Sequence, residues 1–199
     1  MNDWIGLLAA CSVAYIAHAT TLTRAVLRVL RQRNTHVEPG TVSVIVCIKN
    51  DAEHWPAWWA AMKGQQWPAG TEVIAIDDGS TDQLPVLLEQ AAHDDVPFAF
   101  IHHRLDGTSP GKRDALRLGV GQATGDWLLF TDVDCQPAGP LWASEMIAGH
   151  SDDVAAVLGV SWPKDEAQAT WLTRVQALDA MYIMRSYVGW AERGNPYMG

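Results

Sequence analysis

Acidic residues follow three of the predicted strands at the point where each strand ends. They are Asp51, Asp77, Asp78, Asp132 and Asp134. Carboxylates brought together raise one another's pKa, so such a group needs a cation or a ligand rich in hydrogen-bond donors. Mg²⁺ is typically bound by one or two carboxylates together with substrate phosphates. The pattern therefore predicts a metal-assisted site for a nucleotide diphosphate.

Each acidic motif, taken alone, has an ordinary explanation. An Asp-x-Asp pair arises by chance in a chain this rich in aspartate, and Asp77-Asp78-Gly79-Ser80 is also typical of a hydrogen-bonded turn. Their joint position after hydrophobic strands makes the signal specific, because ligands of open α/β sheets bind outside the carboxyl ends of the strands.

Other chemically active residues carry weaker signals. The sequence Gly111-Lys112-Arg113-Asp114 opens a predicted helix, where cations and backbone N–H groups could face phosphates or simply form a solvated first turn. His102 and His103 have no partner at metal-ligand spacing. The three cysteines are scattered without a Cys-x-x-Cys pair, which fits a reducing compartment.

The elements that position these residues alternate between strand and helix. Predicted strands cover residues 42–48, 72–76, 98–102, 127–131 and 154–160, and predicted helices cover 53–62, 84–92, 112–123, 140–149 and 168–187. Alternating strands and helices of about ten residues indicate an α/β domain with a mainly parallel sheet. The helical spacing of Trp55, Trp58, Trp59 and Met62 predicts core packing rather than chemistry.

The N-terminal segment differs from the rest of the chain. Trp4 to Leu22 carries no formal charge and is long enough to cross a bilayer. Four arginines at 24, 28, 31 and 33 follow it, so the positive-inside rule places the remainder of the chain in the cytoplasm. An amphipathic or buried helix is the alternative, and residues 34–40 resemble a linker.

Charge is distributed unevenly between these parts. The 199 residues have a formal net charge of −9, with four arginines and one aspartate before residue 34 and 10 basic against 22 acidic residues after it. An acidic domain disfavours general nucleic-acid binding. Three cysteines cannot form a complete disulfide framework in a small scaffold.

With these motifs in order, the chain from about Val42 to Gly199 resembles the family 2 glycosyltransferases, which are inverting enzymes of the GT-A fold. The motifs are VSVIVCIKND, VIAIDDGSTD, GKRDALRLGVGQATGDWLLFTDVD and GNPYMG. The resemblance implies a Rossmann-like, mainly parallel sheet with flanking helices, preceded here by a transmembrane helix.

The resemblance also implies roles for individual residues. Asp78 would contact the nucleoside, Asp51 would do similar work, Asp134 would bind Mg²⁺ or Mn²⁺ on the diphosphate with Asp132 beside it, and Lys112 would lie near the donor. The predicted nucleotide-sugar-binding set is Asp51, Asp77, Asp78, Lys112 and Asp132, and the predicted metal ligands are Asp134 and Asp132.

The sequence departs from the family pattern in two places. The turn Cys47-Ile48-Lys49-Asn50-Asp51 replaces the usual end of the first strand, and no late acidic motif supplies the general base, which we expect beyond Gly199. Asp179 is predicted to be structural. We therefore expect an anchor at 1–33, a linker at 34–40 and a C-terminally incomplete glycosyltransferase domain at 41–199, inactive by itself.

These inferences lead to one hypothesis and two alternatives. The hypothesis is metal-dependent transfer of a sugar, with inversion, from a nucleotide-diphosphate sugar to a glycan or lipid-linked acceptor. Such an enzyme would be a single-pass protein of the inner or plasma membrane that serves polysaccharide biosynthesis. The alternatives are a membrane-anchored nucleotide-binding module without catalysis and a nucleotidyltransferase.

Overall fold

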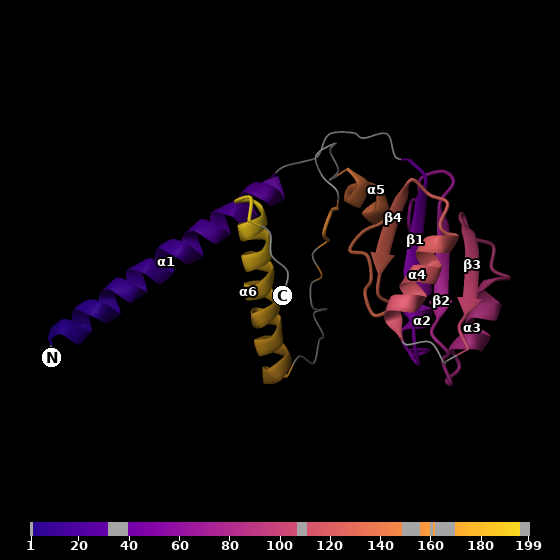
Figure 1. Ribbon diagram of the computed structural model, residues 1–199, viewed down its shortest axis with the longest axis horizontal. Coiled ribbons are helices and arrows are strands. Elements are labelled where there is room, and N and C mark those ends of the chain that lie inside the picture. Colours follow the sequence, from indigo (N-terminus) through magenta and orange to yellow (C-terminus); the bar gives the residue numbers. More distant parts are fainter. Residues whose placement is uncertain are drawn as a thin grey trace. The chain divides into compact units, whose positions relative to one another are not determined.

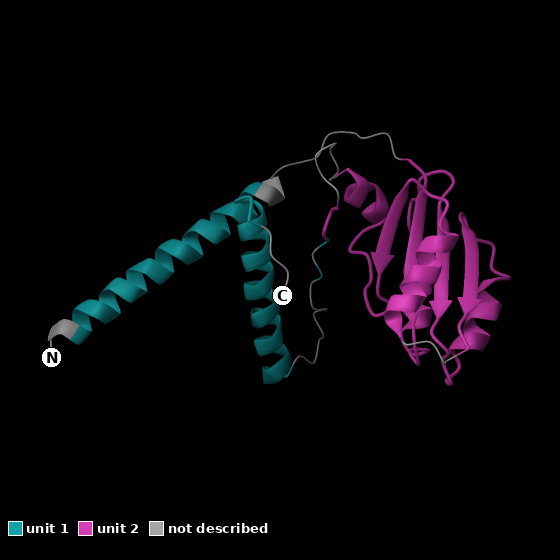
Figure 2. Ribbon diagram, viewed as in Figure 1, with its two compact units in different colours: residues 1–33, 159–199 teal, residues 34–158 magenta. Residues whose placement is uncertain are grey.

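The computed structural model describes residues 2–31, 40–106, 111–148, 156–159, 161 and 170–195. It divides into two compact units, one formed by residues 1–33 and 159–199 and the other by residues 34–158 (Figure 2). Each unit is described by itself. The predicted site residues all belong to the unit 34–158.

A four-stranded parallel sheet forms the centre of the unit 34–158 (Figure 1). Its strands are β1 (Val42–Ile48), β2 (Glu72–Asp77), β3 (Ala99–Arg104) and β4 (Trp127–Thr131), in the order β3-β2-β1-β4. The direction of strand succession therefore reverses between β1 and β4. A reversal of this kind opens a crevice at the carboxyl ends of the two strands.

Short helices follow the strands, and three of them begin at residues suited to helix N-termini. They are α2 (Trp55–Lys63), α3 (Leu84–Ala91), α4 (Lys112–Gln122) and α5 (Trp142–Ile147). Pro56 and Pro85 lie in the first turns of α2 and α3, where a missing N–H costs no hydrogen bond. Gly111 precedes α4 with a φ of 115°, a conformation that a side chain would strain.

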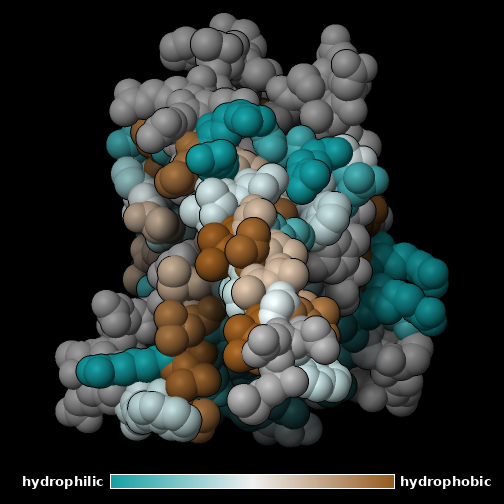
Figure 3. Space-filling model, turned by 90° about the vertical axis from the view of Figure 1, so that its left-hand side faces the viewer, coloured by the Kyte–Doolittle hydropathy of each residue, from teal (hydrophilic) through white to brown (hydrophobic). Residues whose placement is uncertain are grey.

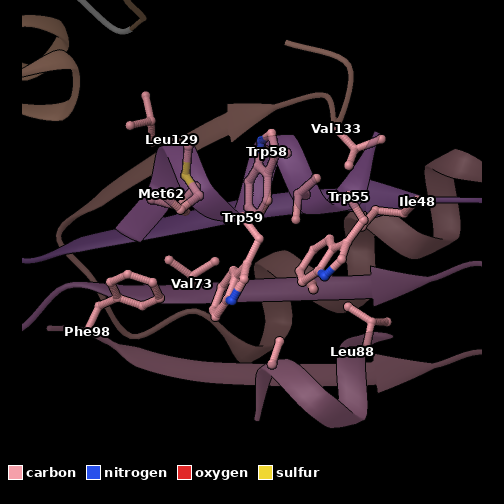
Figure 4. Close-up of a cluster of buried hydrophobic side chains, with 14 of the residues drawn as sticks. Ile48, Trp55, Trp58, Trp59, Met62, Val73, Leu88, Phe98, Leu129 and Val133 are labelled. Carbon is pink, nitrogen blue, oxygen red and sulfur yellow. The ribbon is translucent and has the colours of Figure 1, made fainter. Parts of the chain in front are cut away.

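The helices cover both faces of the sheet because side chains alternate along β1. Val44 and Val46 lie in the larger core cluster with residues of α2, α3 and α5. Trp55, Trp58 and Trp59 are buried in this cluster, which confirms the predicted core role of the tryptophan stripe (Figure 4).

On the opposite face, α4 approaches the sheet very closely. A Cβ atom at Gly119 would lie 2.6 Å from Ile45 Cγ2, so only glycine permits this approach. Ala115 of α4 is buried on the same face, where it packs with Ile74 and Ile76 of β2. This packing places Lys112, the first residue of α4, over the carboxyl end of β1.

A buried carboxylate joins three segments at the other end of the sheet. Glu72 Oε1 accepts hydrogen bonds from Ser43 Oγ (2.5 Å), Thr124 N (2.6 Å) and Thr124 Oγ1 (3.0 Å). Burial of the Glu72 carboxyl opposes ionisation, but the hydrogen bonds from Ser43 and Thr124 outweigh this effect and lower its pKa. Glu72 therefore ties β2 to β1 and to the turn before β4.

The unit 1–33 with 159–199 contains two long helices, α1 (Asn2–Arg31) and α6 (Trp171–Ala191). Within α1, the segment Trp4–Arg28 is long and apolar enough to cross a membrane, and few of its residues are buried. Thr170 caps α6 by accepting a hydrogen bond from the Thr173 N–H at 3.2 Å.

The structure corrects several predicted boundaries. The predicted strand 154–160 is wrong for residues 156–159, which form neither strand nor helix; this segment is rich in alanine and glycine, which favour strands weakly. The last helix begins at Trp171 rather than at residue 168, and β3 extends to Arg104 rather than ending at residue 102. The predicted linker, apart from Gly40, and the last four residues of the GNPYMG motif lie outside the described residues.

We expect Glu72→Gln to lower the free energy of unfolding by about 1 kcal/mol at neutral pH, because a neutral amide oxygen accepts weaker hydrogen bonds than a carboxylate. The folded-state pKa of Glu72 is lowered, so its contribution is present above the unfolded-state pKa and is lost as the pH falls through the folded-state pKa. Denaturant unfolding followed by tryptophan fluorescence at neutral and acidic pH measures this difference.

The matched control is Glu145→Gln, which neutralises an exposed carboxylate in the same unit. It should leave stability nearly unchanged at both pH values. A Glu72→Gln variant that stays less stable by the same amount in acid would contradict the assigned ionisation.

Candidate active site

The predicted site residues lie at the carboxyl edge of the sheet, around the crevice between β1 and β4. A cavity of about 270 Å³ opens there, lined by Cys47, Ile48, Lys49, Asp51, Lys112, Asp132, Val133 and Asp134. A second hollow of about 340 Å³ shares Cys47, Lys112 and Asp132 and extends toward Phe130 of β4. The structure thus brings Asp51, Lys112, Asp132 and Asp134 together in one pocket.

The loops that follow β1 and β2 hold each other in place. Asn50 has a φ of 52°, and its Oδ1 accepts hydrogen bonds from the N–H (2.8 Å) and hydroxyl (3.2 Å) of Thr81. Ser80 Oγ accepts a hydrogen bond from the Asn50 N–H at 2.9 Å, and Asp82 Oδ2 accepts one from the Ala52 N–H at 2.9 Å. These reciprocal bonds fix the position of the neighbouring Asp51.

The two aspartates that end β2 are buried and differ in their partners. Asp77 is fully buried, accepts a hydrogen bond from the Ser80 N–H at 2.7 Å, and lies 3.5 Å from Arg104 Nε. Asp78 is 4% exposed, with its Oδ2 3.2 Å from Lys49 Nζ. Its Oδ1 is buried and receives no hydrogen bond from the described part of the chain.

The Asp-x-Asp motif forms a turn directly after β4. The Cys135 N–H donates to the Asp132 carbonyl at 3.1 Å, and both carboxylates of the motif are exposed. Lys112 Nζ donates to Asp132 Oδ1 at 2.5 Å, and this hydrogen bond raises the pKa of Lys112. Asp134 forms no ion pair with any side chain that the structure describes.

Cys47 lines the pocket, and its thiol is not activated. Burial raises the pKa of its thiol to about 11, and the charges of Asp132 and Asp78 act in the same direction. A thiol in this state is neither a nucleophile nor a ligand for a hard cation. Its small size leaves space between β1 and α4.

A histidine next to the pocket pairs with Asp51. His54 Nδ1 lies 2.5 Å from Asp51 Oδ1, and this hydrogen bond, with the charge of Asp51, raises the pKa of His54. Because the pKa is raised, the ion pair is fully formed below the ordinary histidine pKa and is lost as the pH rises through the higher value. His54 therefore compensates the charge of Asp51 under mildly acidic conditions.

Sequence reasoning identified the carboxylates and missed three of their cationic partners. Lys49, His54 and Arg104 each pair with a site aspartate, and only their position at strand ends or at the start of a helix could have indicated this. His102 and His103 lie within β3, where His102 stacks on Phe100 with ring centroids 5.9 Å apart.

The donor set fits a hard divalent cation that is shared with a ligand. Among the described residues, no three His, Cys, Asp or Glu side chains converge to hold a metal by themselves. Asp132 and Asp134 instead supply two exposed carboxylates beside the pocket, which suits Mg²⁺ or Mn²⁺ when phosphate oxygens complete the coordination. To bind such a cation, Asp132 would have to give up its ion pair with Lys112.

Comparison with known proteins identifies the family of this fold and site. The profile described as "Glycosyl transferase family 2" matches residues 43–196. The chain belongs to this family. The match covers most of the unit 34–158 together with α6, so the family sequence crosses the boundary between the two compact units.

Family 2 relatives differ in what their names say they transfer. The chain is 35% identical over 101 residues to an undecaprenyl-phosphate 4-deoxy-4-formamido-L-arabinose transferase of Pectobacterium carotovorum, covering 48% of this chain and 29% of the relative. It is 27% identical over 138 residues to an N-acetylglucosaminyltransferase of Rhizobium meliloti, covering 69% of this chain and 32% of the relative. The matched segments thus span about a third of these relatives.

A solved structure supports the GT-A fold. The mannosyltransferase of Pyrobaculum calidifontis in complex with GDP-Man and Mn²⁺ has a TM-score of 0.56 with this chain at 23% identity, covering 72% of this chain and 42% of the mannosyltransferase. At this identity the likeness shows the fold. It confirms the predicted GT-A architecture of the family 2 domain.

We expect Asp51→Asn to lower the pKa of His54, because the variant removes both the charged hydrogen-bond acceptor and the nearby negative charge. Titration of the His54 ring signals by NMR measures the change. The control Asp95→Asn alters an exposed aspartate in the same unit and should leave the His54 titration in place. An unchanged His54 pKa in Asp51→Asn would show that the two side chains do not pair in solution.

Proposed function

We propose that this chain carries the nucleotide-sugar-binding part of a family 2 glycosyltransferase that transfers a sugar, with inversion and metal dependence, to a glycan or lipid-linked acceptor. One observation carries the proposal. A pocket at the β1–β4 crevice gathers three exposed or half-buried carboxylates and two lysines from three separate segments. Such a mixture suits a ligand that is both anionic and metal-binding.

The charges of the pocket support binding of a diphosphate with its cation. In the absence of ligand, Asp132 and Lys112 neutralise each other. A cation binding to Asp134 and Asp132 would release the Lys112 ammonium, which could then face a phosphate at the start of α4. The cation, when bound, would neutralise the charge of the departing diphosphate. Asp132 would then pair with the cation and Lys112 with a phosphate, so neither charge would be left unpaired.

The buried aspartates suit recognition of the nucleoside. Asp78 Oδ1 accepts no hydrogen bond from the described residues, and Asp51 lines the pocket. Carboxylates accept hydrogen bonds from N–H groups of a base or from ribose hydroxyls. Asp77, which is fully buried, would act by holding Arg104 and Ser80 in position.

The names of the relatives and the N-terminal helix favour an acceptor near the membrane. One relative is named an undecaprenyl-phosphate 4-deoxy-4-formamido-L-arabinose transferase, and undecaprenyl phosphate is a lipid. In this chain, the segment Trp4–Arg28 can span a bilayer by its length and composition. By the positive-inside rule, the arginines that follow the apolar stretch favour the cytoplasmic side for the unit 34–158. We therefore propose a single-pass protein of the inner or plasma membrane.

Calorimetry on the full chain in detergent tests the metal-dependent site. UDP and GDP should bind more tightly with Mn²⁺ than without it, and Asp134→Asn should remove this dependence because the amide neither carries charge nor ligates a hard cation well. The control Asp95→Asn, on the surface of the same unit, should bind like the native chain. Equal Mn²⁺ dependence in Asp134→Asn would refute the metal assignment.

The role of Lys112 gives a separate test. Lys112→Met should weaken binding of a nucleotide diphosphate about tenfold or more, a loss of about 1.4 kcal/mol, and should leave binding of the corresponding nucleoside unchanged. Lys63→Met is the matched control, because Lys63 forms an ion pair with Asp94 away from the pocket. An equal loss for nucleoside and diphosphate would place Lys112 away from the phosphates.

A further inference from the structure

The two long helices of the unit 1–33 with 159–199 touch only near their C-terminal ends. A Cβ atom at Gly189 would lie 2.6 Å from Leu22 Cδ2, so glycine permits close contact between α6 and α1. Trp190 packs against His18 with ring centroids 5.9 Å apart, and Arg28 pairs with Glu192. Toward its N-terminal end α6 diverges from α1 (Figure 1).

The diverging part of α6 carries an uncovered apolar stripe. Trp171, Val175, Leu178 and Tyr182 follow one another at intervals of three or four residues and are 79%, 40%, 64% and 48% exposed. Seven residues after Tyr182 comes Gly189, which contacts α1. The stripe therefore lies on the face of α6 that meets α1, extended beyond their contact.

The part of α1 that precedes this contact is also apolar and uncovered. Ile5, Leu8, Val13 and Ile16 are each more than 60% exposed, and they belong to the segment that can span a membrane. Figure 3, which views the molecule from the side where α1 begins, shows apolar side chains exposed on that side of the molecule. The stripe of α6 is thus on the side of α6 along which the apolar segment of α1 extends.

Charge separates this unit from the sheet unit. Counted over the sequence, residues 1–33 carry a net charge of +3 and residues 159–199 are neutral, with four basic and four acidic residues, whereas residues 34–158 carry −12. Arg174 and Arg185 are placed beside the stripe on the same side by helical spacing, and the Arg185 guanidinium lies 4.9 Å from the Tyr182 ring. Trp, Tyr and Arg around an apolar stripe are typical of a helix at a membrane interface.

We propose that α6 is a second membrane contact, which lies in the plane of an anionic lipid surface with the stripe directed into the headgroup and acyl-chain boundary. The contact with α1 at Leu22 to Arg28 sets its depth, because this end of the apolar segment, marked by Arg24 and Arg28, lies at the cytoplasmic interface. This inference rests on the proposed anchoring by α1. It adds a surface that would hold the end of the family 2 domain beside lipid.

Depth-dependent fluorescence quenching of the full chain tests this surface. Single cysteines are introduced at stripe positions, such as Leu178→Cys and Val175→Cys, after replacement of Cys11, Cys47 and Cys135, and are labelled with an environment-sensitive dye. The protein is reconstituted in vesicles of phosphatidylcholine and phosphatidylglycerol that contain nitroxide lipids. Stripe labels should be quenched about twofold more than labels at Thr173→Cys and Gln176→Cys on the other side of α6, and more by nitroxides near the headgroup than by deep ones.

A label at Leu8→Cys reports on the anchor separately and should be quenched most by nitroxides near the middle of the bilayer. Quenched Leu8→Cys with unquenched stripe labels would overturn the proposal and show that water or protein covers the stripe. Equal quenching on both sides of α6 would overturn the in-plane orientation. Loss of quenching at all positions would overturn the anchor and the α6 surface together, while the nucleotide-binding results would stand independently.

Discussion

Compensation of crowded carboxylates at one edge of a parallel sheet is the constraint on which the site depends. Parallel strands bring their carboxyl ends to the same edge, so aspartates placed after several strands must come together there. The repulsion is relieved by ion pairs at four of the five aspartates. Asp78 pairs with Lys49, Asp77 with Arg104 and Asp132 with Lys112, each from a different segment, and Asp51 pairs with the neighbouring His54.

This pairing explains how the same residues can stabilise the ligand-free site and serve a ligand. An ion pair that is partly exposed, such as Asp132 with Lys112, contributes little to stability and can open at small cost. A pair at a fully buried carboxylate, such as Asp77, is costly to break because an uncompensated buried charge would remain. The exposed pairs are therefore the ones suited to exchange, and the buried ones are suited to hold the loops.

Packing in the core of the sheet unit fixes the position of this edge. The tryptophan cluster on one face and the close approach of α4 at Gly119 on the other fix where the strands end and where α4 begins. The unit that contains α1 and α6 differs in the character of its surface. Its apolar residues are mostly exposed, and its positive charge contrasts with the acidic sheet unit. The two units thus differ in both their exposed apolar surface and their charge.

The amino-acid sequence alone determined the alternation of strands and helices, the placement of aspartates after strands, the apolar N-terminal helix and the family resemblance. These features are local or periodic, and β1 and β4 were predicted without error. Residues 156–159 were predicted wrongly, because their apolar run contains alanine and glycine, which favour strands weakly. The tertiary structure decided which cation neutralises which carboxylate. Lys49 with Asp78 and Arg104 with Asp77 are separated by 29 and 27 residues; only the strand order and register bring such residues within a few ångströms.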